Sequence, residues 1–533
     1  MRRGAPGRRR IGREHHRGAR DSHHRRARSA GRRPAHARGA DRNSRARAEE
    51  RGAGAVPLNL GPAKVNPERK QILWIVLGLV IFAGVLALPT PEALGTRAHS
   101  SIAIFALCIF WWFTTPVDLP VTALVGLALV PIFGILPAST VFGFFGNQAI
   151  FFVIGVFLIA AVMMKTGLST RLALGLLSRL AGSENQLALG VLILSMALCS
   201  VIVSHAVAAI LLPIVLEILH ALDCDHRSPF AKRVLLSMAW GTVLGSNTTL
   251  LSSARASLAL SLAGGAAGPG SEPISFADFV LASAPLVLLS IVPIYVALRI
   301  AFPPTGISMA PALGLLRTKV KEAGKVRSEE WTTAAVITAM IASMVLFADT
   351  IGLGPLALVF SALLFFLRII RWDDVERYVA WGVILLYGGA IALGQVLEVT
   401  GAAQWIVTDV LPLETVPPWV FLLIFSWAAM ILTELISNSG VVVLLMPIGL
   451  QVAAASGINP AIVVFLTVLP SGLGLTMPTG TPAMAMTFGS GFVKLRDVMV
   501  RGPIVSHLLW LLLMGIAFFI WPHLGMALRA TGG

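Results

Sequence analysis

The sequence predicts an all-α polytopic membrane protein, an inverted repeat with two re-entrant hairpins and about 11 transmembrane helices. Hydrophobic residues make up 56% of the 533 positions, the mean hydropathy is +0.81, and only 13% of the residues are charged. A soluble protein carries roughly 25% charged residues. Runs such as 71–88 and 151–164 are almost free of charge and close to the length that crosses a bilayer.

The positive charge of the chain is concentrated in residues 1–70. This segment holds 21 Lys and Arg against 6 Asp and Glu, whereas the rest of the chain holds 21 and 20. Because it has almost no apolar periodicity, we expect a disordered basic cytoplasmic tail. An untranslated upstream stretch, a tail that contacts anionic lipid, a nucleic-acid-binding segment and a cleaved transit peptide all remain open, and the composition favours the first two. No nucleic-acid partner is expected, because no binding fold or aromatic interleaving is present.

Apolar runs that end at Pro, Gly or charged residues mark the spans. Two further stretches, 187–222 and 417–455, are broken at mid-length by Ser204-His205 and by Ser437-Asn438-Ser439. Two half-length helices that meet at a polar tip form a re-entrant hairpin, which a membrane tolerates only where the tip lines a cavity. The predicted spans are 72–89, 99–114, 119–136, 149–166, 229–263, 277–301, 333–349, 354–370, 381–397, 460–492 (interrupted) and 503–524.

The basic loops and an internal repeat predict the topology. Lys and Arg cluster in alternate loops, which predicts a cytoplasmic N-terminus in the inner (plasma) membrane and hairpins that enter from opposite sides. A single offset in residue number carries both Thr166-Gly167 onto Thr400-Gly401 and Pro213 onto Pro447. We therefore expect a first repeat over 72–301, a cytoplasmic linker over 302–332 and a second repeat over 333–525.

Four polar breaks in the apolar runs are the candidate site. They are Ser204-His205, Gly245–Thr249, Ser437–Ser439 and Thr479–Thr481. Free N–H groups at half-helix N-termini bind anions, while freed carbonyls and hydroxyls coordinate a small cation. The alternative is that small residues merely allow close helix packing. Breaks that recur in register in a repeat favour a binding site.

Three ionisable residues lie near these breaks. His205 is interpreted either as a proton-sensitive group or as a buried core residue, and Arg255 either as an anion ligand or as an interfacial anchor. Glu434 either pairs with a cation or caps its hairpin. The sequence has no P-loop and no catalytic motif, and its three cysteines have no metal-ligand spacing, so neither an enzyme nor a cofactor is expected.

The C-terminal half resembles the divalent anion/sodium symporter family of dicarboxylate, citrate and sulfate carriers, and the likeness extends over about 72–525. The segment 381–395, reading WGVILLYGGAIALGQ, is similar to the span before the family's second hairpin. Ser437-Asn438-Ser439 matches the family's Ser-Asn-Thr tip, and TPAMA followed by FGSG over 481–491 is similar to its TPPNA and FGSG. In the first half, Val203-Ser204-His205 and Gly245–Thr249 replace the corresponding motifs. In the second half, Met484 replaces an expected asparagine.

The resemblance implies a homodimeric secondary transporter of small anions. It would be coupled to sodium, to protons or to both, and would use an elevator-like movement; an anion channel, an exchanger or a non-transporting sensor is the alternative. Sodium is expected at Ser437, Asn438 and Gly480, and at a first-half site of Ser204, Gly245 and Ser246 that lacks the family's asparagine. The residues expected to bind the anion are Ser204, His205, Thr248, Arg255, Ser439, Thr481 and Pro482.

Overall fold

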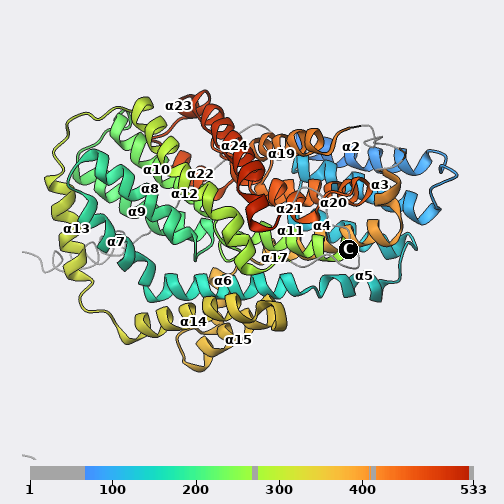
Figure 1. The fold of residues 1–533 in the computed structure, drawn as a ribbon, viewed down its shortest axis with the longest axis horizontal. Helices are drawn as coiled ribbons and strands as arrows, with labels where there is room; N and C mark the ends of the chain where they lie inside the picture. The colour runs from blue at the N-terminus through green and yellow to red at the C-terminus, as the bar shows by residue number, and fades with distance from the viewer. Residues whose placement is uncertain (1–66, 267–273, 407–408, 410–415, 527–533) are drawn as a thin grey trace, which may run out of the picture. The chain divides into compact units, whose positions relative to one another are not determined.

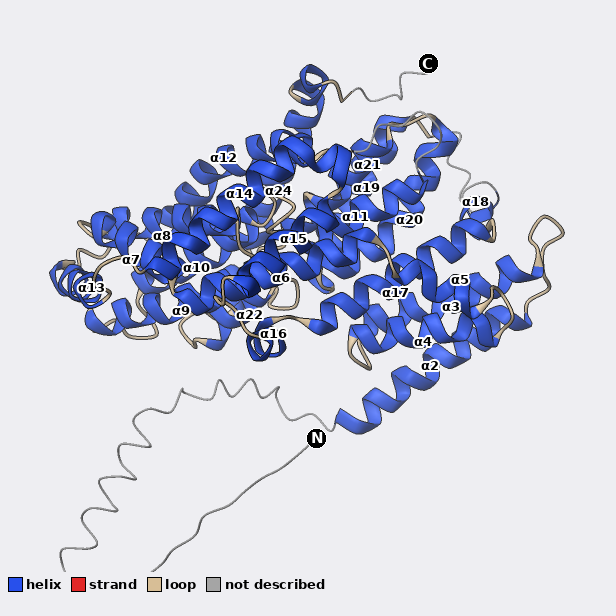
Figure 2. Ribbon diagram, turned by 90° about the horizontal axis from the view of Figure 1, so that it is seen from below, coloured by secondary structure: helices blue, strands red, loops and turns tan. Residues whose placement is uncertain are grey.

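Every regular element in the described part of the chain is helical. The computed structural model describes residues 67–266, 274–406, 409 and 416–526 (Figures 1 and 2). The predicted tail lies outside these ranges, apart from its last residues, which begin the first described helix. Ten helices in the described ranges are long and apolar enough to cross a membrane, which confirms the multi-pass helical fold class.

Nine predicted spans coincide with helices of the structure. In each case the helix persists over the apolar run and ends near the Pro, Gly or charged residue that follows it. These helices are α2 (Pro67–Ala87), α3 (Thr96–Thr114), α4 (Leu119–Ile132), α6 (Gln148–Thr166), α12 (Phe276–Ala301), α14 (Ser328–Ile351), α15 (Leu353–Phe366), α17 (Trp381–Val399) and α24 (Arg501–Phe519).

The two predicted hairpins are present as helix pairs. The first consists of α8 (Glu184–Cys199) and α9 (Ser204–Ala221), and the second of α19 (Pro418–Leu435) and α20 (Asn438–Ser456). Helices α9 and α20 are related by the offset found in the sequence, and each contains its proline at the same position. Gly167 and Gly401, which the same offset relates, both have φ of 77° in the left-handed region, where glycine is favoured. The backbone therefore repeats in register with the sequence.

The remaining two spans are interrupted helices. The first comprises α10 (Pro229–Gly245) and α11 (Ala254–Ala266); the second comprises α21 (Pro460–Val468), the short 3₁₀ turn η3 (Pro470–Gly472) and α22 (Pro482–Gly489). The second half of each one packs on the hairpin of the other repeat: α22 lies against α9, and α11 lies against α20 (Figure 1). This exchange brings the polar breaks of the two halves together.

Several short helices were not expected from the apolar runs. Two of them, α7 (Leu168–Leu180) and α13 (Ala310–Glu322), carry basic residues and pack against each other. Hydropathy marks such segments as loops because only one face of the helix is apolar. The others are α5 (Ala138–Phe145), α16 (Trp372–Tyr378), α18 (Ala402–Trp405) and α23 (Leu495–Val498); the 3₁₀ turn η4 (Trp521–Leu524) lies at the end of the last predicted span.

Ion pairs hold the C-terminal end of α6 to these connecting segments. Lys165 lies 2.6 Å from the carboxylate of Asp374 on α16. Burial by itself raises the pKa of Asp374. Hydrogen bonds from Lys165 and from the backbone N–H of Arg371, and the positive charges of these two residues, outweigh burial and lower the pKa overall. At the start of α7, Arg171 lies 2.9 Å from Glu330 and donates to the carbonyl oxygens of Ala323 and Gly324. The linker is thereby attached to the first repeat.

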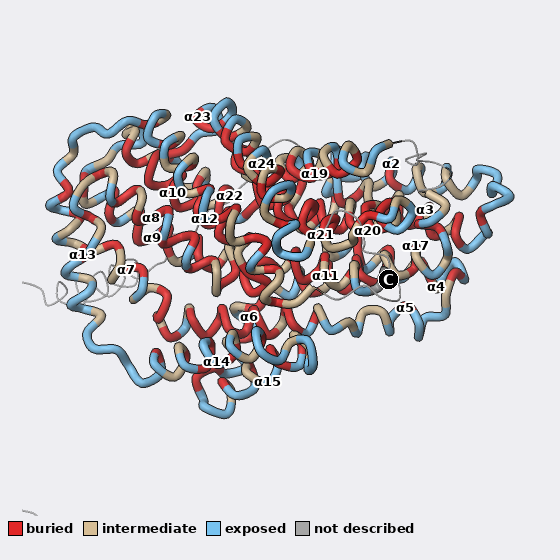
Figure 3. The backbone as a smooth tube through the Cα atoms, viewed as in Figure 1, coloured by how far each residue is buried: buried red, intermediate tan, exposed pale blue. Residues whose placement is uncertain are grey.

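Burial separates the helices into a core and an outer layer (Figure 3). Helices α6, α8, α10 and α17 are buried over most of their length, whereas α2 exposes Ile72, Leu73 and Val80. Only 6% of the apolar window of α2 and 22% of that of α14 are buried within the chain. Exposed apolar faces of this extent suit contact with lipid or with a second membrane protein.

The contact between α6 and α15 gives a stability prediction. A Cβ atom on Gly155 would lie 2.6 Å from the Cβ of Ala357, so the two helices meet without room for a side chain. Gly155→Val should therefore destabilise the protein, because overpacking costs about 1–3 kcal/mol. The matched control is Gly175→Ala on α7, where nothing lies within 4 Å of the new atom. We expect a lower unfolding temperature for the first variant only, measured by fluorescence in detergent; equal temperatures would contradict the packing.

Candidate functional site

The tip of the second hairpin meets the second break. Ser437 caps α20 by accepting a hydrogen bond from the backbone N–H of Gly440 (3.1 Å). The backbone N–H of Asn438 donates to the carbonyl oxygen of Gly480 (3.4 Å). A Cβ atom on Gly480 would lie 3.5 Å from Oδ1 of Asn438 and 2.7 Å from the carbonyl oxygen of Thr433. The three residues expected to hold sodium therefore lie together, and Gly480 is required for their close approach.

The amide of Asn438 is buried and only half satisfied. Its Oδ1 lies 2.6 Å from the hydroxyl of Thr433, which also lies 2.8 Å from the carbonyl oxygen of Ser471. A hydroxyl has one proton, so Thr433 donates to only one of these two oxygens. Among the described residues, Nδ2 of Asn438 has no partner. Buried polar atoms are nearly always paired, so this end of the amide makes Asn438 a candidate ligand-binding residue.

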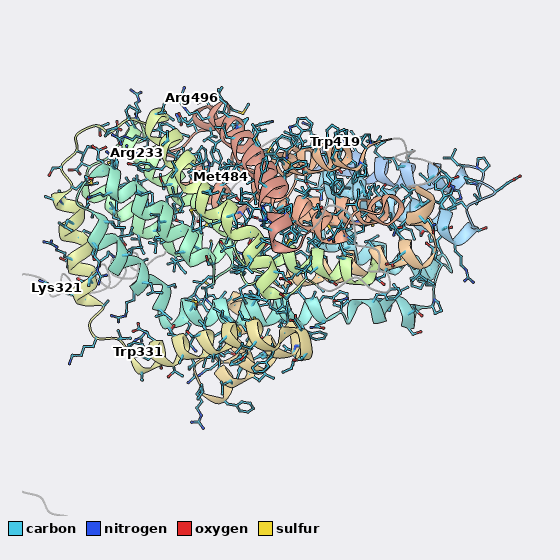
Figure 4. The ribbon with its side chains drawn as sticks, viewed as in Figure 1. Arg233, Lys321, Trp331, Trp419, Met484 and Arg496 are labelled. Carbon is cyan, nitrogen blue, oxygen red and sulfur yellow. The ribbon has the colours of Figure 1, made fainter. Side chains whose placement is uncertain are left out.

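The residues expected to bind the anion in the second half surround the same tip. The hydroxyl of Ser439 lies 2.7 Å from that of Tyr387 on α17. Thr481 caps α22 by accepting from the backbone N–H of Met484, and Pro482, which is exposed, is the first residue of that helix. Met484, labelled in Figure 4, lies on α22 and is fully buried, so an apolar side chain stands where the resemblance implies an asparagine.

Glu434 caps a loop rather than the hairpin. Its carboxylate accepts hydrogen bonds from the backbone N–H groups of Leu475, Thr476 and Met477 at 2.8–3.2 Å and from the Thr476 hydroxyl at 2.9 Å. Its own carbonyl oxygen accepts from the hydroxyl of Thr479. Charge-assisted bonds of this kind fix the chain that leads into Gly480. Of the two interpretations of Glu434, the structure favours capping. The capped segment is residues 475–477, which precede the break at Thr479–Thr481, and not the hairpin itself.

The first break is closed by its own contacts. Gly245 packs so tightly that an added Cβ would lie 2.6 Å from Cα of Met196 on α8. Thr248 donates to the carbonyl oxygen of Gly245 (2.8 Å), and Thr249 donates to that of Ser200 at the end of α8 (2.7 Å). In the described part of the chain Ser204 forms no hydrogen bond to this loop. The three residues expected at the first sodium site are therefore not joined as those of the second are.

His205 follows Ser204 at the N-terminus of α9. Its ring lies 5.7 Å from that of Phe157 on α6, at an interplanar angle of 53°. The pair places His205 between the first hairpin and the span that precedes it.

Arg255 is buried in the first turn of α11, a few residues after the first break. Only 6% of it is exposed, and its guanidinium donates to Oγ of Ser246 (3.3 Å), to Oδ1 of Asn247 and to the carbonyl oxygen of Val468 (3.4 Å). Asn247 in turn donates to the carbonyl oxygen of Gly472. Arg255 is thus a buried cation at the junction of the two interrupted helices, and not an interfacial anchor.

Unpaired polar atoms gather around the breaks. Of the seven buried side-chain atoms that lack a partner among the described residues, four lie on α11, α20 and α22, the half-helices that follow the breaks. Helices α11 and α20 pack against each other, so three of these atoms belong to one helix pair, whereas α22 packs on α9 and α10. The four residues are Ser257 and Ser261 on α11, Asn438 on α20 and Thr487 on α22.

Three residues of the site were not singled out from the sequence. Tyr387 bonds the second tip, Thr433 bonds its asparagine, and Asn247 bonds the buried arginine. Tyr387 lies within the 381–395 motif, and Asn247 lies within a predicted break, so both could have been named as site residues from the sequence. Thr433 lies one helical turn before the tip, where an intramembrane hydroxyl is easily ascribed to a backbone hydrogen bond.

The chain is similar along most of its length to membrane transporters. The family model described as the sodium:sulfate symporter transmembrane region matches residues 69–527. The sodium-dependent dicarboxylate transporter SdcS of Staphylococcus saprophyticus is 26% identical over 481 residues, covering 85% of this chain and 92% of the relative. The transporter of the same name from Staphylococcus aureus is 25% identical over 481 residues, covering 85% of this chain and 91% of that relative.

Two solved structures share the fold. The YdaH transporter of Alcanivorax borkumensis aligns with a TM-score of 0.50 and 16% identity, over 86% of this chain and 99% of that one. MtrF of Neisseria gonorrhoeae, described as one of a class of antimetabolite efflux pumps, aligns with a TM-score of 0.50 and 16% identity, over 86% of this chain and 96% of that one. At this identity the likeness concerns the fold alone, and it agrees with the all-helical architecture described above.

Proposed function

The chain belongs to the sodium:sulfate symporter family, and from that premise we propose that it is a secondary active transporter that carries a small dicarboxylate anion together with sodium. The relatives named above are sodium-dependent dicarboxylate transporters, which supports this choice of substrate and ion. The observation that carries the proposal is the second tip, where a buried amide with one free end lies beside Gly480.

We place one sodium ion at Ser437, Asn438 and Gly480. If Thr433 donates its single proton to Ser471, a rotated Asn438 amide donates from Nδ2 to Thr433, which leaves Oδ1 as the free atom. An amide oxygen, a hydroxyl and a backbone carbonyl are the neutral ligands that unwound segments supply to sodium in transporters. In the described residues no group of three His, Cys, Asp or Glu could hold a metal ion, so neutral oxygens suit the site better than a carboxylate cage.

The anion is proposed to bind between the two tips. Its ligands would be Ser204, His205 and Thr248 from the first half and Ser439, Thr481 and Pro482 from the second, with Arg255 contributing positive charge. Helices α9 and α20 both begin at these tips, and the positive end of each helix dipole favours a carboxylate there. A dianion then needs the sodium ion and the arginine as its counter-charges.

Transport by this site requires alternating access. We propose that the two hairpins and interrupted helices move as one body against a scaffold formed by 72–136 and 333–370, in a homodimer with a cytoplasmic N-terminus. The close packing of α9 on α22 and of α11 on α20 supports a single mobile body. Residues 302–332 connect the two repeats, so they are proposed to follow that movement.

The transporter is distinguished from a channel on the same fold by counterflow. Purified protein in proteoliposomes is preloaded with unlabelled succinate, and labelled succinate is added outside in the presence of sodium. A carrier takes up label faster when preloaded, because substrate inside speeds the return of the binding site. A channel shows no such acceleration, and that result would contradict the proposal.

The role of His205 is tested by replacing its titratable ring. A proton-sensitive site group predicts that uptake rises as the pH falls, because a protonated imidazole adds positive charge beside the bound anion. His205→Asn should then remove the rise while leaving uptake at alkaline pH within twofold of the parent. A pH profile that is the same in both proteins assigns His205 to the core beside Phe157.

A further inference from the structure

We propose that the guanidinium of Arg255 is a resident cation that takes the place of one coupling ion, so that each anion is carried with a single sodium ion. The inference rests on the proposed function and adds the number of sodium ions to it. It starts from the chemistry of the atoms that surround Arg255.

The partners of Arg255 are the kind of ligand that a sodium ion uses. They are a hydroxyl oxygen (Ser246), an amide oxygen (Asn247) and a backbone carbonyl oxygen (Val468), all of them neutral. Ser246 belongs to the loop where the family places its first sodium site. A guanidinium that donates to these oxygens satisfies them as a bound cation would.

The position of the guanidinium in the fold also suits a cation. Ser246 is the C-cap of α10, and Val468 is the last residue of α21. The carbonyl groups at helix C-termini carry a partial negative charge, so the ends of two helices stabilise positive charge at one place. Gly472 seals this place, since a Cβ there would lie 2.3 Å from Nη2 of Arg255 and 2.4 Å from Oδ1 of Asn247.

A second buried arginine of the same repeat, Arg233, differs from Arg255 because it forms an ion pair. Arg233, labelled in Figure 4, is fully buried on α10, and its Nη2 lies 3.2 Å from the carboxylate of Glu184. Its charge is neutralised within the protein. The three hydrogen bonds of Arg255 instead go to uncharged atoms, so its positive charge remains available to the bound anion.

The first tip supports the same conclusion. Ser204 occupies the position that Asn438 occupies in the second half, at the first residue of the corresponding helix. The amide that helps to hold sodium in the second half is therefore missing from the first. The guanidinium of Arg255 supplies the positive charge from the other side of the break.

The number of coupled ions is measured first on the wild-type protein. Labelled succinate uptake into proteoliposomes at about pH 7.5 is recorded against external sodium, with choline as the replacement ion. We expect a Hill coefficient near one. One sodium ion and a dianion move one net negative charge inward, so an inside-positive potential should accelerate uptake; Arg255 returns with the empty carrier and adds no net charge. A Hill coefficient of two with uptake independent of potential would overturn the proposal.

Variants then test whether the charge of Arg255 is the cause. Arg255→Ala vacates the three oxygens, so we expect a second sodium ion to become necessary: a Hill coefficient near two and at least tenfold weaker apparent sodium affinity. Arg255→Lys keeps the charge and should keep the coefficient near one. The matched control is Arg233→Gln, which removes a carboxylate-paired arginine and should leave the coefficient unchanged. A coefficient near one in Arg255→Ala, with unchanged affinity, would also overturn the proposal.

Direct binding keeps the two proposals separate. Binding of labelled sodium to the purified protein counts sites without transport, and we expect one site per chain in the wild type. Two sites would overturn the assignment of Arg255 even if dicarboxylate transport is confirmed. One site with no succinate uptake would instead leave that assignment standing and contradict the proposed transport activity.

Discussion

Asn438→Ala is expected to abolish sodium-dependent uptake, with less than about 1% of the parent rate remaining. The substitution removes the amide that lies beside Gly480 and bonds Thr433, and with it one of the three proposed sodium ligands. It also removes the buried amide end that is free to meet a ligand. The measurement is labelled succinate uptake into proteoliposomes at saturating sodium, normalised to the amount of reconstituted protein.

A neighbouring asparagine provides the control for Asn438. Asn459 caps α21 in the same repeat by accepting a hydrogen bond from the backbone N–H of Ala461 (3.0 Å). Asn459→Ala loses a helix cap, which costs about 1 kcal/mol of stability, but no proposed ligand. We expect it to transport within a few-fold of the parent. Wild-type rates in Asn438→Ala would show that the sodium site has been misplaced.

Glu434→Ala is expected to lower the free energy of unfolding more than Gly155→Val or Asn459→Ala does. The carboxylate accepts four hydrogen bonds from residues 475–477, and Leu475 and Thr476 are buried. Each buried donor left unpaired costs about 1–3 kcal/mol, so several kcal/mol are at stake. We expect a marked fall in the unfolding temperature in detergent, and loss of uptake because the loop that positions Gly480 is released.

Two comparisons make the Glu434 result specific. Glu434→Gln keeps one acceptor oxygen and should retain part of the stability. Glu376 on α16 is exposed, so Glu376→Ala should leave the unfolding temperature unchanged. If Glu434→Ala melts at the parent temperature, the carboxylate does not hold the loop.

The fold was predictable because the membrane imposes a strong pattern on the sequence. Apolar runs marked the spans, and two polar interruptions at mid-length marked the hairpins that the structure forms at α8–α9 and α19–α20. The offset between the repeats was also visible in the sequence, because it relates Gly167 to Gly401. In the structure both glycines have a left-handed backbone, as expected for equivalent positions of a repeat. Short amphipathic helices such as α7 and α13 were missed, because hydropathy alone does not separate them from basic loops.

The site was predictable only in part. The four breaks and Asn438 followed from polar residues in apolar surroundings, whereas the direction of the Arg255 side chain did not. That direction depends on Val468 and Gly472, which belong to the other repeat and approach only because the interrupted helices exchange hairpins. Glu434 shows the same limit: one residue type fits both cation binding and capping, and only the fold places Leu475–Met477 within its reach.

Accumulation of labelled succinate driven by a sodium gradient tests the central claim most directly. Proteoliposomes that contain the wild-type protein are loaded without sodium and diluted into sodium medium, and internal label is followed to its plateau. A sodium-coupled carrier concentrates succinate above the external level and loses the excess when an ionophore dissipates the gradient. A plateau at the external concentration, the same with sodium, choline or ionophore, would contradict the account.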